Sequence, residues 1–255
     1  MAQNYRKRAN QLEAQGYTKT DVEAEVLFGR ELAVKIVGAY PLLKDQDLTR
    51  YINLVGKAVA MYSNRPELEF RFGVLDTDDV NAFSAPGGYI FITKGCLRLA
   101  KDEAELAGIL AHEIAHVSER HIVKEINIRG SEDSPVSGFS AVISGPSAVV
   151  EKTVSALLDQ AYAILFERGY KIQQEYEADR IGTQMIYMAG YDPEALQRFL
   201  QRVLESGYAY QMQKTHPNIQ ERIKVLQNFL EENDMKNKAN RKNEVRYEEK
   251  TRKIK

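Results

Sequence analysis

Two histidines and one glutamate stand at a spacing that suits a metal ion. The sequence HEIAH places His112 and His116 four residues apart, with Glu113 directly after the first. On an α-helix, residues i and i+4 lie on one face, so both imidazoles can bind a single zinc ion from consecutive turns. Glu113 then lies close enough to hold a zinc-bound water. The pattern predicts a hydrolytic zinc site; the alternative is two unrelated histidines on a helix surface.

A catalytic zinc usually takes three protein ligands and leaves one position for water, so a third ligand is needed. His121 lies five residues after His116, one short of the metzincin spacing, and on the opposite side of the helix from His112. We interpret it as a structural or supporting histidine. Cys96 shows no matching spacing and fits a packed small apolar residue. Glu175 is therefore the best candidate.

Glu175 begins the sequence EYEAD, which has helical character. Helical spacing places Glu175 and Asp179 on one face, so Glu175 can complete a His₂Glu site from a second helix. Asp179 can then accept the N–H of a ligating imidazole and fix its tautomer. Glu177 points elsewhere by helical phase and is a weaker candidate. The alternative is that all these acids form a solvated helix face.

The elements that must hold these residues follow from hydrophobic periodicity. A spacing of 3.6 predicts helices over 20–40, 45–62, 102–126, 150–189 with a break near Gly169, 193–205 and 218–232. Thr20 with Glu23 fits a capping box for the first helix. An alternation of period 2 at Leu68, Phe70, Phe72 and Val74 predicts a strand, and 82–85 and 89–93 fit two more.

The predicted fold class is α+β. We expect a mainly helical domain with a small antiparallel β-sheet next to the HExxH helix. The expected organisation is an N-terminal arm over 1–19, a main domain over 20–235 and a basic C-terminal tail over 236–255. The tail holds nine Lys/Arg and three Glu, which favours a solvated, frayed segment over a partner contact. Residues 130–148, rich in Gly, Ser and Pro, predict a lid over the cleft or a passive connection.

Composition narrows the function classes. The 255 residues are 44% hydrophobic and 28% charged, with a net charge of −1. These values fit a globular domain and exclude a whole-protein basic field, so no nucleic-acid partner is expected. No stretch approaches the roughly 20 apolar residues of a membrane-spanning helix, so no transmembrane segment is expected. The single Cys96 excludes an intrachain disulfide and a Cys-rich zinc module.

HExxH followed downstream by ExxAD resembles the M48 family of zinc metallopeptidases, within the gluzincins. The resemblance implies that the domain over 20–235 is a zincin-like metallopeptidase domain. Further segments carry the resemblance, which spans about residues 20–230: NAFSAPGG from Asn81, HEIAHVSERH from His112, EYEADRIG from Glu175, and the late pair Thr215-His216-Pro217 and Glu221-Arg222-Ile223. The sequence is most similar to the soluble bacterial branch of the family. The membrane spans of the CAAX-processing branch and the TPR array of some relatives have no counterpart in this sequence.

The resemblance implies a role for each matching residue. It makes His112, His116 and Glu175 the ligands of one Zn²⁺ per chain and Glu113 the general base and acid, with Asp179 as the supporting carboxylate. His216 would act as a transition-state donor or as a fourth ligand that blocks the site; the alternative is a turn residue before Pro217. Arg222 would position Asp179 or Glu175. A further role follows from position and not from the resemblance: Asn81, Ala82, Phe83 and Ser84 lie between two predicted strands and upstream of the HExxH helix, so as an edge strand they would bind substrate.

The expected function is zinc-dependent endopeptidase activity on unfolded or misassembled polypeptides, by attack of a water that Glu113 activates. The alternative is a zinc-bound chaperone or assembly factor with little or latent proteolysis; a structural zinc site or another metallohydrolase is less well supported. The resemblance implies a periplasmic or outer-membrane-associated protein whose signal is absent from this sequence, which is compatible with peripheral membrane association. A cytoplasmic location and the oligomeric state stay open.

Overall fold

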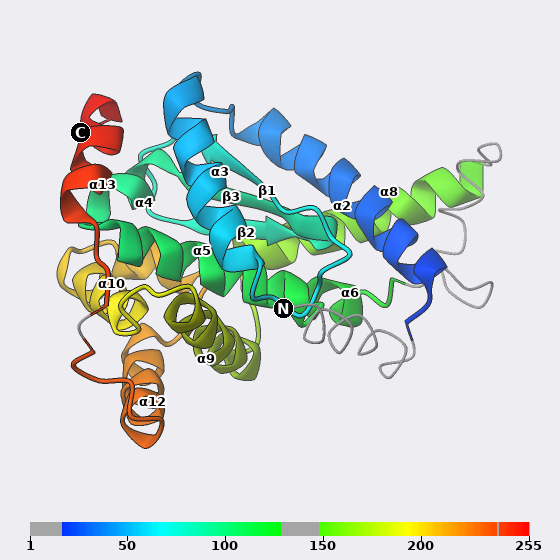
Figure 1. Cartoon of the computed structure of the whole chain (residues 1–255). Coiled ribbons are helices and arrows are strands. Elements are labelled where there is room, and N and C mark those ends of the chain that lie inside the picture. The colour runs from blue at the N-terminus through cyan, green and yellow to red at the C-terminus, as the bar shows by residue number, and fades with distance from the viewer. Residues whose placement is uncertain (1–16, 129–147, 239, 255) are drawn as a thin grey trace.

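The computed structural model describes residues 17–128, 148–238 and 240–254 (Figure 1). The expected arm over 1–19 and lid over 130–148 therefore lie almost wholly outside the described residues. The described part is mainly helical. Its helices are α2 (Lys19–Ala39), α3 (Gln46–Ala60), α4 (Lys94–Leu99), α5 (Glu103–Ser118), α6 (His121–Glu125), α8 (Ala148–Ala163), the π-helix η2 (Ile164–Arg168), α9 (Ile172–Met188), α10 (Ala195–Glu205), α11 (Ala209–Gln213), α12 (Ile219–Glu232) and α13 (Glu244–Thr251). Two short 3₁₀ turns are η1 (Pro86–Gly88) and η3 (Arg252–Ile254).

Three strands, β1 (Arg71–Leu75), β2 (Ala82–Ala85) and β3 (Tyr89–Thr93), form a sheet in the order β1-β3-β2. Strands β2 and β3 pair antiparallel, as expected, but β1 and β3 pair parallel. The sheet is therefore mixed, and the expectation of a wholly antiparallel sheet is wrong for β1. The reason is that residues 76–81 carry the chain past the position that β3 then fills, which leaves β2 at the edge.

Each face of the sheet packs against helices. Because successive side chains of a strand point to opposite faces, Ile90 and Ile92 of β3 enter one hydrophobic core and Phe91 enters the other. The first core joins the sheet to α3, α5, α9, α10 and α12. The second joins it to α2, α6, α8 and η2. This two-sided burial explains why β3 is apolar along most of its length.

Helix α5 occupies the centre of the molecule. Figure 1 shows it crossing between the sheet and the layer formed by α9, α10 and α12. The side chain of Asp102 caps its N-terminus by accepting from the backbone N–H of Glu105 at 2.8 Å, as the sequence predicted. Every residue of α5 is buried. The metal-binding pattern therefore stands on a helix that is packed all round, which fixes its side chains firmly.

Helices α4, α11 and α13 were not predicted, and two of the predicted helices have other limits. Helix α2 begins at Lys19 with Thr18 as its N-cap, and the capping box joins Thr18 to Asp21 instead of Thr20 to Glu23. The helix expected over 102–126 ends at Ser118, because Arg120 adopts a left-handed conformation with φ 55°. The chain then starts α6 at His121 in a new direction.

The C-terminal segment is folded against the domain, so the expectation of a solvated, frayed tail is wrong for residues 244–254. Tyr247 of α13 is fully buried, and its hydroxyl donates to the carbonyl oxygen of Leu97 at 2.6 Å. Arg246 and Asn243 donate to the buried carboxylate of Glu103 at the start of α5. Across the described ranges, no helix is both long and apolar enough to cross a bilayer.

Candidate metal centre

Helices α5 and α9 bring the predicted ligands together. Nε2 of His112 and Nε2 of His116 lie 3.0 Å apart. Oε2 of Glu175 lies 3.6 Å from Nε2 of His112, and Oε1 of Glu175 lies 3.5 Å from Nε2 of His116. A tetrahedral zinc with bonds of about 2.0–2.1 Å separates its ligand atoms by roughly 3.3 Å. These three donors therefore fit a zinc ion in both chemistry and spacing.

Gly182 allows this close approach of the two helices. A Cβ atom built on Gly182 of α9 would lie 3.0 Å from the backbone nitrogen of His112 and 3.1 Å from the carbonyl carbon of Ala111. A larger residue would push α9 away from α5 and carry Glu175 with it. Gly182 thus sets the distance across which one carboxylate reaches two histidines.

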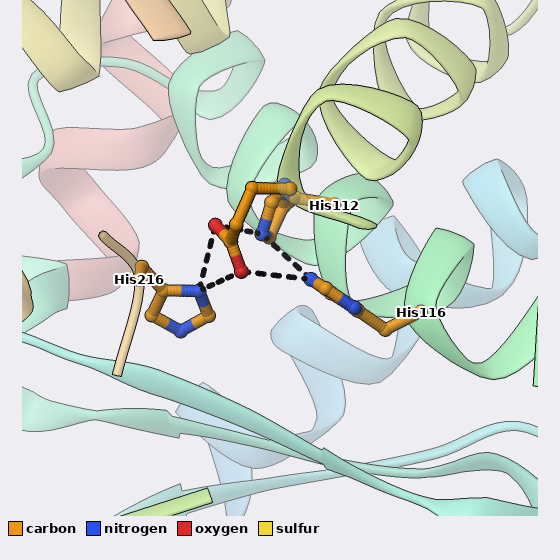
Figure 2. Close-up of side chains that lie close together, drawn as sticks. His112, His116 and His216 are labelled. Atoms are coloured by element: carbon orange, nitrogen blue, oxygen red, sulfur yellow. Dashed lines mark hydrogen bonds and ion pairs between the residues drawn. The ribbon is translucent and has the colours of Figure 1, made fainter. Parts of the chain in front are cut away.

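His216 approaches the same point from the loop between α11 and α12. Its Nδ1 lies 3.2 Å and 3.3 Å from the two oxygens of Glu175, and its Nε2 donates to the carbonyl oxygen of Ala82 at 3.3 Å. Four residues each place one ligand atom within 4.8 Å of the other three: His112, His116, Glu175 and His216. Figure 2 shows the three imidazoles converging on a shared carboxylate. The geometry suits either expected role of His216, as a donor or as a fourth ligand.

Asp179 and Arg222 support the ligands from behind. Oδ1 of Asp179 lies 2.9 Å from Nδ1 of His112, on the ring edge opposite the metal-facing nitrogen. Arg222 donates to both oxygens of Asp179, at 2.8 Å and 2.7 Å, and its Nη1 lies 2.6 Å from Glu175. The guanidinium therefore contacts both carboxylates, and the two alternatives for Arg222 hold together in this structure.

The surroundings of His116 and Glu175 favour the protonation states that can bind a metal. Burial, with the neighbouring His112 and His121, holds the pKa of His116 well below its usual value, so its imidazole stays neutral. Burial alone would raise the pKa of Glu175, but the Arg222 cation and His216 outweigh it and lower that pKa. Burial opposes a charge on His216 too, yet the Glu175 carboxylate raises the pKa of its ring.

Glu113 lies beside this group and is also buried. Its Oε1 lies 3.8 Å from Nε2 of His216, while its Oε2 has no hydrogen-bond partner among the residues that the structure describes. Buried polar atoms are rarely left without a partner, and an exception needs an explanation. A carboxylate oxygen held ready for a water or a substrate amide explains this one.

The four expected substrate-binding residues lie on or directly before β2, at the edge of the sheet, and all are buried. Asn81 donates to the hydroxyl of Thr215 at 3.0 Å. Ala82 contacts His216 through its carbonyl oxygen, and Phe83 stacks on Phe166 with ring centroids 4.2 Å apart. The hydroxyl of Ser84 is buried and has no hydrogen-bond partner among the described residues. The strand therefore adjoins the metal centre, but other side chains cover it here.

Sequence reasoning missed two contributors to this site, Tyr170 and Gly169. Tyr170 stacks on the ring of His116 with centroids 3.8 Å apart, and His121, which the sequence indicated as a supporting histidine, lies behind that ring with Glu177. Gly169, with φ 73°, lets the chain pass against the His216 loop, where a Cβ would lie 2.7 Å from the carbonyl oxygen of Thr215. The sequence signal for these two residues was the predicted helix break at Gly169, which stands directly before Tyr170.

Known proteins from bacteria and from mitochondria are similar to this chain over most of its length. The chain is 28% identical over 214 residues to the beta-barrel assembly-enhancing protease of Escherichia coli K12, a match that covers 80% of this chain and 43% of that protein. It is 30% identical to the Yersinia pestis protein of the same name, over 81% of this chain and 44% of the relative. It is also 30% identical to the mitochondrial metalloendopeptidase OMA1 of Schizosaccharomyces pombe, over 74% of this chain and 55% of the relative.

These matches confirm the prediction of a metallopeptidase, although the chain spans less than half the length of the two bacterial relatives. Residues 46–230 match peptidase family M48. This range covers most of the described domain and holds every ligand candidate named above. The chain therefore belongs to peptidase family M48.

Proposed function

We propose that this chain is a zinc-dependent endopeptidase that hydrolyses peptide bonds of unfolded or misassembled polypeptides. One observation carries the proposal: three donors stand at tetrahedral spacing beside a glutamate whose buried Oε2 has no partner among the described residues. A structural zinc site would have no use for this buried carboxylate oxygen of Glu113 beside its ligands. Family membership and the names of the relatives support the same activity.

In the proposed mechanism, His112, His116 and Glu175 would hold the zinc ion. Bound there, zinc would supply a Lewis acid for the scissile carbonyl and would lower the pKa of water. Glu113 accepts the proton from the attacking water through its Oε2 and passes it to the leaving amine. His216 donates a hydrogen bond to the developing oxyanion from Nε2, after releasing the carbonyl of Ala82. Arg222 keeps Glu175 and Asp179 ionised throughout.

The test compares wild type with Glu113→Gln on unfolded casein, each loaded with one equivalent of zinc. We expect the substitution to leave the zinc content unchanged and to lower the cleavage rate by about 10²–10⁴-fold, since it removes the general base. Glu31→Gln, at an exposed position on α2, is the matched control and should cleave at the wild-type rate. Cleavage by Glu113→Gln at the control rate would refute this mechanism.

A binding-only function is the second candidate, because the site is closed. His112, the most exposed of the potential ligands, is only 4% exposed. A zinc-bound chaperone or assembly factor that rarely cuts would tolerate this closure. If neither wild type nor Glu113→Gln cleaves casein while both bind it, this candidate replaces the first.

Substrate binding along β2 follows from the strand's position. The backbone groups of Ala82 face away from β3, because its carbonyl oxygen accepts from His216 and its N–H donates to the side chain of Asn81. The same two groups could instead pair with an extended peptide. We expect prolines placed near the cleavage site of a model peptide to block cleavage, since proline lacks the N–H needed for pairing. Equal cleavage of proline-containing peptides would argue against strand pairing.

The cellular role is proposed by analogy with the relatives. The bacterial relatives are named for enhancing β-barrel assembly, so we propose an exported protein that acts on misassembled polypeptides in the periplasm or at the outer membrane. Fractionation of cells that produce the full reading frame tests this location. Recovery in the cytoplasm would contradict it.

A further inference from the structure

The ring of His116 is held from behind by a second histidine. Nδ1 of His116 lies 2.7 Å from Nδ1 of His121, and Nε2 of His121 lies 3.1 Å from Oε2 of Glu177. His121 is buried, whereas the side chain of Glu177 is 41% exposed. A hydrogen-bonded chain therefore runs from a carboxylate at the surface to an imidazole at the metal centre.

The break in the helix after α5 makes this contact. On an unbroken helix, His121 would point roughly 140° away from His116. The left-handed conformation of Arg120 ends α5 and starts α6, which turns His121 back onto the ring. Tyr170 packs flat on one face of the same ring, at 3.8 Å and 19°. His116 is thus fixed at one edge and on one face before any metal binds.

The positions of the protons along the chain follow from the acceptor at its end. A carboxylate only accepts hydrogen bonds, so Nε2 of His121 carries a hydrogen and donates to Glu177. A neutral imidazole then has its lone pair on Nδ1, which accepts from the Nδ1–H of His116. This leaves the lone pair of His116 on Nε2, the nitrogen that faces His112 and Glu175. That tautomer is the one that a zinc ligand needs.

We propose that His121 and Glu177 are positioning residues that fix the tautomer and ring orientation of His116 for metal binding. His112 is oriented directly by Asp179, whereas His116 is oriented by Glu177 through His121. Helix α9 would then supply one ligand, Glu175, and the carboxylates that orient both histidines. The proposal rests on the metal site of the proposed function but does not require cleavage.

The test measures zinc affinity by chelator competition at one fixed pH, together with the visible spectrum of the Co²⁺-loaded protein. His121→Phe keeps a ring but removes the acceptor, and we expect it to weaken zinc binding by about 10–100-fold and to shift the Co²⁺ bands. His121→Asn places a side-chain oxygen as many bonds from Cα as Nδ1, so we expect it to restore most of the affinity and the wild-type spectrum.

Glu177→Gln tests the surface end of the chain. Glu125→Gln is its matched control, because Glu125 lies on α6 next to the same region with a side chain 38% exposed but pairs with Lys171. We expect Glu177→Gln to weaken zinc binding several-fold and Glu125→Gln to leave it unchanged. In the His121→Asn background, Glu177→Gln should have no further effect, since the chain is already cut.

The proposal is overturned if His121→Phe, with the melting temperature of its metal-free form unchanged, binds zinc as tightly as wild type. Equal effects of Glu177→Gln and Glu125→Gln would also overturn it, since only the general surface charge would then matter. Failure of wild type to cleave casein while these affinities change as expected would refute the proposed function and leave the positioning role intact.

Discussion

At the residue scale, the site buries charged groups, which costs folding free energy unless they are paired. Glu175 and Asp179 are both buried, and Arg222 is the cation that contacts both. Spacing alone predicted the two carboxylates, because residues i and i+4 must share a helix face. The pairing of Arg222 with both of them depends on how α12 packs on α9, which no local pattern encodes; it was expected only from the family resemblance.

Replacing Arg222 should therefore destabilise the metal-free protein. Without the guanidinium, two buried carboxylates lose their partner, and we expect Arg222→Met to cost about 3–5 kcal/mol of unfolding free energy in the presence of a chelator. Zinc should recover part of this loss, since it binds one of the carboxylates. Arg222→Lys keeps a charge but cannot reproduce the bidentate fork, so its loss should be intermediate. Urea unfolding of wild type and both variants, with and without zinc, measures these losses and the recovery by zinc. A loss below about 1 kcal/mol for Arg222→Met would contradict the argument.

At the element scale, most helices followed from periodicity, and the errors have physical causes. The helix expected through residue 126 ends at Ser118, because Arg120 adopts a left-handed conformation that propensity disfavours and that the packing around this buried residue must impose. The parallel pairing of β1 was missed because strand order depends on how the chain crosses the sheet, which alternation of side chains does not reveal.

The approach of α9 to α5 gives a prediction at this scale. Gly182→Ala places a Cβ 3.0 Å from the backbone of His112, so we expect it to lower stability by about 1–3 kcal/mol and to weaken zinc binding. Gly38→Ala is the control: it also lies in a helix, α2, but its Cβ would meet nothing within 4 Å. That substitution should stabilise by about 0.4–1 kcal/mol and leave zinc affinity unchanged. Urea unfolding and chelator competition measure both, and unchanged zinc affinity in Gly182→Ala would show that α9 can shift without loss.

At the scale of the whole molecule, the C-terminal segment closes the domain onto the start of α5. Charged residues dominate this segment, which is why it was expected to be solvated. Its buried side chains, Tyr247, Thr251 and Ile254, are few but recur at helical spacing. The anchor is the buried carboxylate of Glu103, which accepts from four side chains in three distant parts of the sequence: Tyr51, Tyr191, Asn243 and Arg246. No short-range pattern predicts such a meeting point.

This anchor makes stability depend on pH. Burial would raise the pKa of Glu103, but hydrogen bonds from Arg246 and the other donors outweigh it and lower that pKa. A group with a lowered folded-state pKa stabilises the fold above its unfolded value of about 4.3, and that contribution is lost as the pH falls through the folded value. Glu103→Gln should therefore cost roughly 2 kcal/mol at pH 7 and less in acid. Urea unfolding across pH measures this, with the exposed Glu249→Gln as control; a difference from wild type that does not shrink in acid would contradict it.

The burial of every potential ligand also bears on how fast a metal would leave. Because His112, His116, Glu175 and His216 are at most 4% exposed, a chelator in solvent cannot reach an ion held between them. Release must wait until α9 or the His216 loop separates from α5, an event that belongs to the protein and not to the chelator. The rate of zinc loss should therefore become independent of chelator concentration and equal the opening rate of the domain. Measuring that rate would then give the rate of an opening motion that the proposed cleavage also requires.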